Sequence, residues 1–377
     1  MATLNQLFTD TDLTLASGGH LSEYQLCYNT YGELNEEKSN AILVFHALSG
    51  SHNLTGQDVE GPADCPFWNE ESHDGWWAEL IGEGKAVDTS KYFVISFNYL
   101  GGCYGSTGPA STNPETGQPY GGSFPAISIA DQALVGKNLL TALGIQTLHA
   151  VVGPSVGGLC SLSFATNYPE MAPRVGIFAS GMRTTVLTRL TLFEQIIAIE
   201  NDPNFKGGDY YDGETPWLGL ALARMISHKT FVHIDTFEQR ARQDIKPHED
   251  ILSWYKLQDP FQSYMLHQGK KFVQRFDPNT YLRIIDMWSR FNLFKDAEGN
   301  EIQGVFDHLK AHDQKFLVYS IDSDYCFYPE EQRELVEALE ASDIDVTYLT
   351  VHSSKGHDSF LLEPNLYAPQ LRHLLEQ

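Results

Sequence analysis

Short runs of apolar residues recur along the chain, each five or six residues long and rich in valine, isoleucine and phenylalanine. Runs of this length and composition predict buried β-strands. They lie at Ala41–Phe45, Tyr92–Phe97, Leu148–Val152, Val175–Ala179, Phe316–Ile321 and Val346–Val351. Helical patterns separate several of them, at Ile127–Leu143, Gly158–Asn167 and Glu330–Ala341. The alternation predicts an α/β fold with a mainly parallel, doubly wound sheet covered by helices on both faces.

The pattern changes between Thr184 and Asp313, where amphipathic helical stretches follow one another without a run typical of a buried strand. Such a segment is too long to be a loop. We therefore predict a helical lid at residues 184–313, inserted between core parts at residues 1–183 and 314–377. Its apolar faces are available to cover an active site or to join a second subunit, and we expect Phe272 and Trp288 to be packing residues.

Composition narrows the choice of partners and compartment. The 377 residues include 25 basic and 49 acidic side chains, and the formal charge of −24 repels nucleic acid and anionic membrane surfaces. We find no run of apolar residues long enough for a membrane span and no pattern of a signal peptide. The five cysteines are scattered, without a C-x-x-C pair or histidines at metal-ligand spacing. We predict a cytoplasmic protein with no bound metal.

The strongest local motif is G-P-S-V-G at Gly153–Gly157, which follows one predicted strand and precedes a predicted helix. A G-x-S-x-G sequence in this context is typical of a nucleophile elbow, a strained turn that exposes a serine above the sheet. The motif predicts Ser155 as the nucleophile. The N–H of Val156, at the start of the helix, is then a candidate donor to an oxyanion.

A serine nucleophile needs a base and an acid that orients it, and in this motif's fold they follow in the order Asp or Glu, then His. Asp322 and Asp324 both follow the predicted strand Phe316–Ile321, and spacing does not choose between them. His357 is favoured as the base because it follows a glycine in a loop, whereas His352 directly continues a strand. For the other histidines, including His46, His228 and His233, we expect structural roles.

Two further loops carry candidate functional groups. The segment Phe45–Gly50 follows the strand Ala41–Phe45, in the position from which this fold takes its second oxyanion donor. The N–H of Leu48 is the candidate. Residues Asn98–Tyr120 are dense in Gly, Pro, Ser, Thr and Asn, and an ordered loop of this length is more often functional than not.

Taken together, these segments resemble the homoserine O-acetyltransferase family, a group of α/β-hydrolase-fold enzymes with a helical lid. The resemblance covers nearly the whole chain. Its most specific motifs are Phe45–Gly50, Asn98–Pro109, Ala223–Ile226, Ser323–Asp324 and Gly356–Asp358. It implies a catalytic triad of Ser155, Asp324 and His357, and oxyanion N–H groups from Leu48 and Val156.

The resemblance also implies a substrate site. The arginine that matches Arg224 binds the acceptor's carboxylate, and the aspartate that matches Asp358 holds its ammonium group, pairings that suit a guanidinium fork and a carboxylate. Phe231 stands where a substrate-contacting tyrosine is usual, and Pro154 and Val156 replace the usual Gly and Met of the elbow. The triad is unaffected by these departures, but the acceptor pocket has lost a hydroxyl group.

The function we predict is ping-pong acyl transfer through an acyl-serine, from acetyl-CoA as co-substrate to homoserine, with no bound cofactor. The resemblance further implies a homodimer that forms through the lid. The same acyl-serine attacked by water would make the protein an esterase, and only the acceptor site distinguishes the two. A third hypothesis is that the protein is a non-catalytic member of the fold. The presence of Ser155, Asp324 and His357 argues against it.

Overall fold

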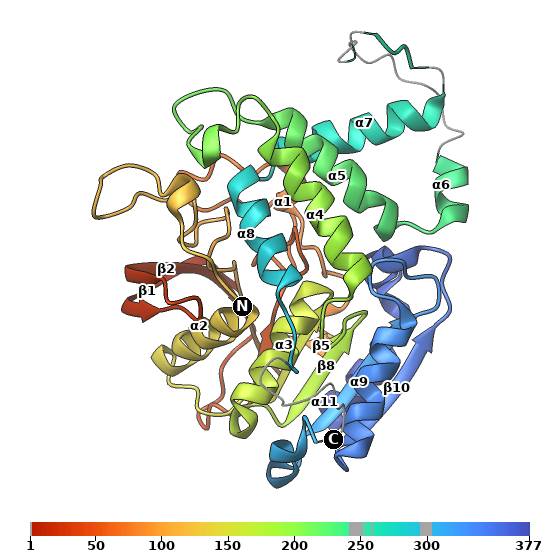
Figure 1. Ribbon diagram of the computed structural model, residues 1–377. Coiled ribbons are helices and arrows are strands. Elements are labelled where there is room, and N and C mark those ends of the chain that lie inside the picture. Colours follow the sequence, from red (N-terminus) through yellow and green to blue (C-terminus); the bar gives the residue numbers. More distant parts are fainter. Residues whose placement is uncertain (1, 241–251, 253, 258, 295–303) are drawn as a thin grey trace.

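The computed structural model describes residues 2–240, 252, 254–257, 259–294 and 304–377. Its main sheet has eight strands in the order β1-β2-β6-β3-β7-β8-β9-β10. The pair β1 and β2 lies on one side of the molecule and β10 on the other (Figure 1). Strand β2 pairs antiparallel with β1 on one side and with β6 on the other, and the other pairs in this sheet are parallel. The strands are β1 (Ala2–Thr14), β2 (His20–Tyr31), β3 (Ala41–Val44), β6 (Phe93–Phe97), β7 (Ala150–Pro154), β8 (Arg174–Phe178), β9 (Lys315–Ile321) and β10 (Asp345–Val351), with a separate pair β4 (Ile81–Gly82) and β5 (Val87–Asp88).

Both faces of the sheet are buried, which explains the continuous apolar runs in the sequence. Val151 packs in a core cluster with α2 (Ile129–Ala142), α3 (Val156–Asn167) and α9 (Pro329–Ala341). Its neighbour Val152 points to the other side, into a cluster that includes α11 (Ala368–Glu376). Alternate side chains of a strand leave opposite faces, so each face needs its own apolar set. The predicted mainly parallel α/β sheet is confirmed.

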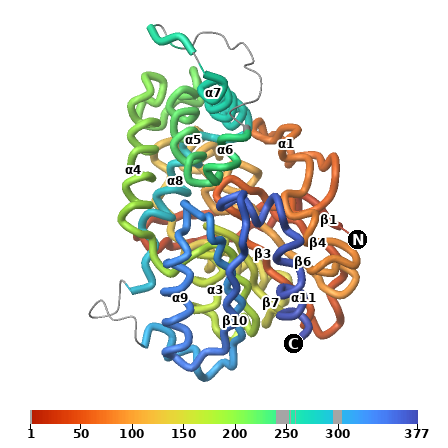
Figure 2. Tube along the Cα trace, turned by 90° about the vertical axis from the view of Figure 1, so that its right-hand side faces the viewer, coloured from red at the N-terminus to blue at the C-terminus, as the bar shows by residue number. Residues whose placement is uncertain are grey.

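Helices α4, α5, α7 and α8 gather at one end of the molecule, above the sheet (Figures 1 and 2). The helices of the segment predicted to be the lid are α4 (Val186–Glu200), α5 (Trp217–Phe231), α6 (Ile234–Arg240), α7 (Pro260–Val273) and α8 (Pro278–Ser289). Phe272 and Trp288 are buried, as expected of packing residues. Residues 241–251, 253, 258 and 295–303 of the segment lie outside the described residues.

The N-terminal hairpin of β1 and β2 was not expected from the sequence. Its strands are long, but β1 lies at the edge of the sheet and most of its side chains are exposed. An edge strand of this kind carries few apolar residues and so lacks the signal of a buried strand. Elsewhere the expected elements begin and end within a few residues of the observed ones. No helix in the described ranges is long and apolar enough to cross a membrane.

Candidate active site

Ser155 lies on the sharp turn between β7 and α3, with φ 56° and ψ −127°. A positive φ in a residue with a side chain costs about 1–3 kcal/mol, so the surrounding structure must enforce it. Gly153 and Gly157 allow this close turn. A Cβ on Gly153 would lie 2.2 Å from the carbonyl oxygen of Gly157, and one on Gly157 would lie 2.4 Å from the carbonyl oxygen of Phe45. The two motif glycines therefore meet a packing requirement.

The structure brings Ser155, His357 and Asp324 together. The Oγ of Ser155 lies 2.9 Å from Nε2 of His357, and Nδ1 of His357 lies 2.7 Å from Oδ2 of Asp324. An ionised carboxylate only accepts hydrogen bonds, so Nδ1 carries a proton and Nε2 is free to accept the serine proton. The Asp324 side chain is fully buried and that of His357 is 4% exposed. This geometry suits a serine, base and acid acting in sequence.

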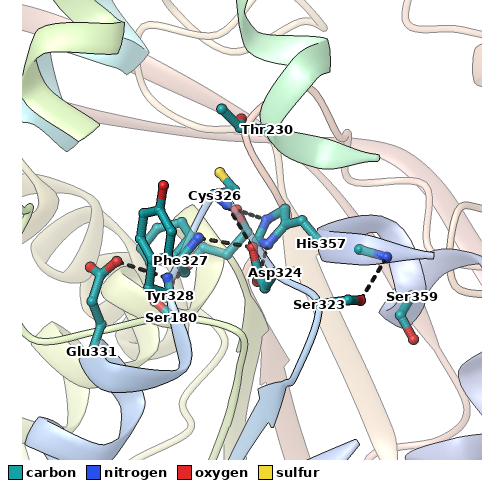
Figure 3. Close-up of polar contacts among 12 residues, drawn as sticks. Ser180, Thr230, Ser323, Asp324, Cys326, Phe327, Tyr328, Glu331, His357 and Ser359 are labelled. Atoms are coloured by element: carbon teal, nitrogen blue, oxygen red, sulfur yellow. Dashed lines mark hydrogen bonds and ion pairs between the residues drawn. The ribbon is translucent and has the colours of Figure 1, made fainter. Parts of the chain in front are cut away.

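Two backbone amides fix the Asp324 carboxylate. Its Oδ1 accepts hydrogen bonds from the N–H groups of Cys326 at 2.7 Å and Phe327 at 2.9 Å (Figure 3). The Phe327 ring stacks on the His357 ring, with centroids 5.5 Å apart. The loop that follows β9 thus holds both the Asp324 carboxylate and the His357 ring.

The competing aspartate and histidine form a separate pair on the surface. Asp322 accepts a hydrogen bond from Nδ1 of His352 at 2.7 Å, and their side chains are 42% and 84% exposed. Of the two aspartates between which spacing does not choose, Asp324 faces His357 from the buried side of the loop, whereas Asp322 pairs with His352 at the surface.

Glu331, a glutamate close to Asp324, has a raised pKa. Burial raises the pKa of Glu331 to about 8, an effect to which Asp324 adds and which an N–H hydrogen bond from Tyr328 opposes. Glu331 lies at the start of α9, beside the Asp324 loop (Figure 3). A neutral Glu331 at pH 7 adds no second negative charge next to Asp324.

Leu48 and Val156 stand where the sequence predicted oxyanion donors. Leu48 is a central residue of the turn Ala47–Gly50, which Gly50 closes with an N–H hydrogen bond to the Ala47 carbonyl at 3.0 Å. Val156 is the first residue of α3. In the part of the chain that the structure describes, neither amide N–H donates to a protein acceptor. Leu48 and Ser155 line one cavity, and Val156 directly follows Ser155 in the chain.

A cavity of about 210 Å³ opens above Ser155. Its wall combines apolar side chains with charges of both signs. Among the lining residues are Leu48, Ser155, His357, Arg224, Phe231, Asp358, Glu71, Arg275, Tyr104 and Trp288. Sequence reasoning missed Glu71 and Arg275, because neither belongs to a motif.

Arg224, on α5, lies between two aromatic rings. Its guanidinium carbon is 4.8 Å from the centroid of Phe272 and 5.3 Å from that of Phe231. Burial lowers the pKa of Arg224 and the nearby Arg275 lowers it further, while Asp358 acts in the opposite direction. A guanidinium stays protonated all the same. Stacked in this way, it presents a positive, planar fork to the cavity.

Phe231 and Asp358 complete the group predicted for the acceptor. The Phe231 ring lies beside His357, with centroids 5.9 Å apart. Asp358 directly follows His357 in the 3-10 turn Gly356–Asp358. Arg224, Phe231 and Asp358 therefore all line the cavity that contains Ser155. Within the described residues, no three His, Cys, Asp or Glu side chains are arranged to hold a metal ion.

Comparison with known proteins places this site in a family. Residues 40–364 match the model of the alpha/beta hydrolase fold. A homoserine O-acetyltransferase from Methanohalobium evestigatum is 41% identical over 356 residues, which cover 93% of this chain and 69% of that protein. The chain belongs to the homoserine O-acyltransferase family. The predicted α/β-hydrolase fold is thereby confirmed, as is the resemblance seen in the sequence motifs.

The relatives of this homoserine O-acyltransferase family member carry more than one name. A homoserine O-succinyltransferase from Nitrosomonas eutropha is 39% identical over 370 residues, which cover 97% of this chain and 94% of that protein. Among solved structures, esterase E22 superposes with a TM-score of 0.86 and 26% identity, covering 100% of both chains. Proteins named for acetyl transfer, succinyl transfer and ester hydrolysis are thus all similar to this chain.

Proposed function

We propose that the protein transfers an acyl group from an acyl-CoA to the hydroxyl group of homoserine, by a ping-pong mechanism through acylated Ser155. The observation that carries the proposal is that one cavity is lined by Ser155 and His357 together with Arg224 and Asp358, while Asp324 holds His357 from the buried side. The first three supply acyl-serine chemistry, and the last two supply opposite charges that suit an amino acid's carboxylate and ammonium groups.

In the first half-reaction, Oγ of Ser155 attacks the thioester carbonyl while Nε2 of His357 takes the serine proton. The Leu48 and Val156 N–H groups bind the oxyanion of the tetrahedral intermediate. The intermediate collapses to the acyl-serine, and the departing thiolate receives the proton from His357. Asp324 keeps Nδ1 of His357 protonated and stabilises the imidazolium.

In the second half-reaction, the acceptor's hydroxyl group occupies the place of the thiol. His357 takes its proton as the oxygen attacks the acyl-serine carbonyl, and the same two N–H groups bind the second oxyanion. Collapse releases the O-acyl ester and returns the proton to Ser155. The residues that carry these steps need no bound cofactor, and acetyl-CoA is consumed as a substrate.

The identity of the acyl group is a separate part of the proposal. We favour acetyl-CoA as the donor, with succinyl-CoA as the alternative, because relatives named for each acyl group match the chain at 41% and 39% identity. Hydrolysis is the second candidate activity. The similarity to esterase E22 and the phenyl ring of Phe231, which offers no hydroxyl to an acceptor, both favour it.

One assay separates these possibilities. The protein is incubated with acetyl-CoA or succinyl-CoA, with and without homoserine, and thiol release is measured beside the O-acylated product. We expect thiol release to depend on homoserine and to match product formation mole for mole. Equal thiol release with and without homoserine, and no O-acylhomoserine, would establish hydrolysis instead.

We also propose a homodimer that forms through the lid. On α4, Val186, Leu190, Phe193 and Ile197 follow one another at helical spacing, and Val186 and Phe193 are 71% and 56% exposed. Apolar residues on one face of a helix are costly in water and suit a second copy of the chain. Sedimentation at micromolar concentration should give the mass of two chains; the mass of one chain would refute the proposal.

We also propose that the protein is located in the cytoplasm. A reducing cytoplasm suits a chain whose five cysteines are free, and it is where acyl-CoA donors are at hand. The strongly acidic composition favours small-molecule substrates over nucleic acid or anionic membranes.

A further inference from the structure

The turn Ala47–Gly50, which carries the Leu48 N–H, is held from the core on one side. The imidazole Nδ1 of His46 donates to the Ala47 carbonyl at 2.8 Å, and the Tyr99 hydroxyl donates to the His46 carbonyl. Burial lowers the pKa of His46 to about 4, so this histidine is neutral at physiological pH. These contacts fix the start of the turn at His46 and Ala47, but they do not hold its end at Ser49 and Gly50.

The far end of the turn is held by an arginine of the lid segment. Arg275 lies between α7 and α8, and its Nη1 donates to the Ser49 carbonyl at 2.9 Å. Gly50 N–H, in the same peptide plane as that carbonyl, donates to Ala47. The Ser49–Gly50 peptide is thus clamped at both of its polar ends. Among the described residues, Arg275 supplies the one hydrogen bond from the lid segment to this turn.

The Arg275 guanidinium is itself held in one orientation. Its Nε lies 3.2 Å from a carboxylate oxygen of Glu71, and its Nη1 lies 3.3 Å from the Tyr104 hydroxyl oxygen. The Tyr104 hydroxyl donates to the Arg275 carbonyl at 2.6 Å. The side chain stacks over Phe272 and is 16% exposed. A guanidinium with several fixed partners loses little further freedom in bonding Ser49.

We propose that Arg275 is a positioning residue that locks the oxyanion turn against the lid, so that the Leu48 N–H points at the reacting carbonyl. The inference rests on the proposed function, in which that N–H stabilises both tetrahedral intermediates. Stabilisation by a backbone donor depends on its being oriented before the charge develops. Loss of the clamp lets the Ser49–Gly50 peptide rotate and misaligns the donor.

A positioning role predicts a distinctive pattern of effects. Both half-reactions pass through an oxyanion, so Arg275→Met should slow acylation and deacylation together. A misplaced donor costs on the order of 100-fold in rate, with little change in KM for a neutral ester. Arg275→Lys keeps the charge and one donor and should recover part of the rate. Binding of a charged substrate by Arg275 would instead leave neutral esters unaffected.

The test uses the full chain and p-nitrophenyl acetate, a neutral ester, with acylation followed by the burst of nitrophenol. Lys271→Met is the matched control, because Lys271 also pairs with Glu71 but does not reach the turn. We expect slow acylation in Arg275→Met, partial recovery in Arg275→Lys, and wild-type rates in Lys271→Met.

The inference would be overturned if the neutral ester acylated Arg275→Met at the wild-type rate. It would also be overturned if Lys271→Met were slowed as much as Arg275→Met. If Arg275→Met does not fold, Arg275→Lys decides alone: a kcat equal to that of wild type refutes the clamp, and a reduced kcat at constant KM supports it. Failure of the proposed function has different signatures. Ser155→Ala would retain the nitrophenol burst if Ser155 were not the nucleophile, and thiol release from acetyl-CoA would be independent of homoserine if the protein were a hydrolase.

Discussion

Ser155→Ala should lower kcat for acyl transfer by a factor on the order of 10⁶, because Ser155 is the cavity serine whose Oγ lies within hydrogen-bond distance of the base, Nε2 of His357. His357→Ala should be similarly severe, since the serine then has no base. Asp324→Asn should retain more activity, because the acid orients and supports the base without accepting its proton. The measurement is steady-state thiol release from acetyl-CoA in the presence of homoserine.

The surface pair supplies the control for these variants. Asp322→Asn removes a carboxylate two residues from Asp324, yet the imidazole that Asp322 contacts belongs to the exposed His352 and not to His357. We expect turnover close to that of wild type. A crippled Asp322→Asn beside an active Asp324→Asn would reverse the assignment of the acid. A fluorophosphonate should label Ser155 alone, and labelling at another serine would move the nucleophile.

Arg224→Ala separates the two half-reactions. We expect transfer from the acyl-enzyme to homoserine to become about tenfold to more than a hundredfold less efficient. The reason is the loss of a charge-assisted contact to the acceptor's carboxylate, worth about 1.5–3 kcal/mol. Acylation of Ser155 by a simple acetyl ester should remain nearly intact. Burst kinetics give the first step, and O-acylhomoserine formation at varied homoserine concentration gives the second.

Phe231→Tyr tests the same pocket from the opposite direction. If the acceptor site lacks a hydroxyl group, the tyrosine should raise transfer to homoserine without changing acylation by the ester.

Equal loss of both half-reactions in Arg224→Ala would contradict the acceptor role of Arg224. It would point instead to disruption of the cavity, since Arg224 also packs between Phe231 and Phe272.

The sequence allowed the nucleophile to be predicted because its requirements are local. Strand, glycines, serine and helix follow one another within one continuous stretch, so the elbow around Ser155 needs no knowledge of distant contacts. The choice between Asp322 and Asp324 was different. Both follow β9, and only the path of the loop after it decides which carboxylate meets the Cys326 and Phe327 amides. The family resemblance, not spacing, favoured Asp324.

Arg275 shows where prediction from sequence stops. It lies 226 residues from Ser49, in a short connection between two helices, and nothing in its surroundings distinguishes it from an ordinary surface arginine. Its contact with the turn depends on how the lid segment packs on the core, which is a property of the folded chain. The β1–β2 hairpin escaped prediction because neither strand forms a continuous apolar run. Most side chains of β1 are exposed at the sheet edge, and the buried part of β2 includes the polar residues Asn29 and Thr30.

The packing of the nucleophile turn also sets where this sequence is free to diverge. At Gly153 and Gly157 a single added carbon would meet backbone atoms at 2.2 and 2.4 Å, and backbone cannot move aside as a side chain can. Pro154 and Val156 lie between these glycines, and they are the positions that differ from the usual Gly and Met in the resemblance described for the sequence. Variation in this turn is therefore confined to sites that leave the path of the chain, and with it the serine, unchanged.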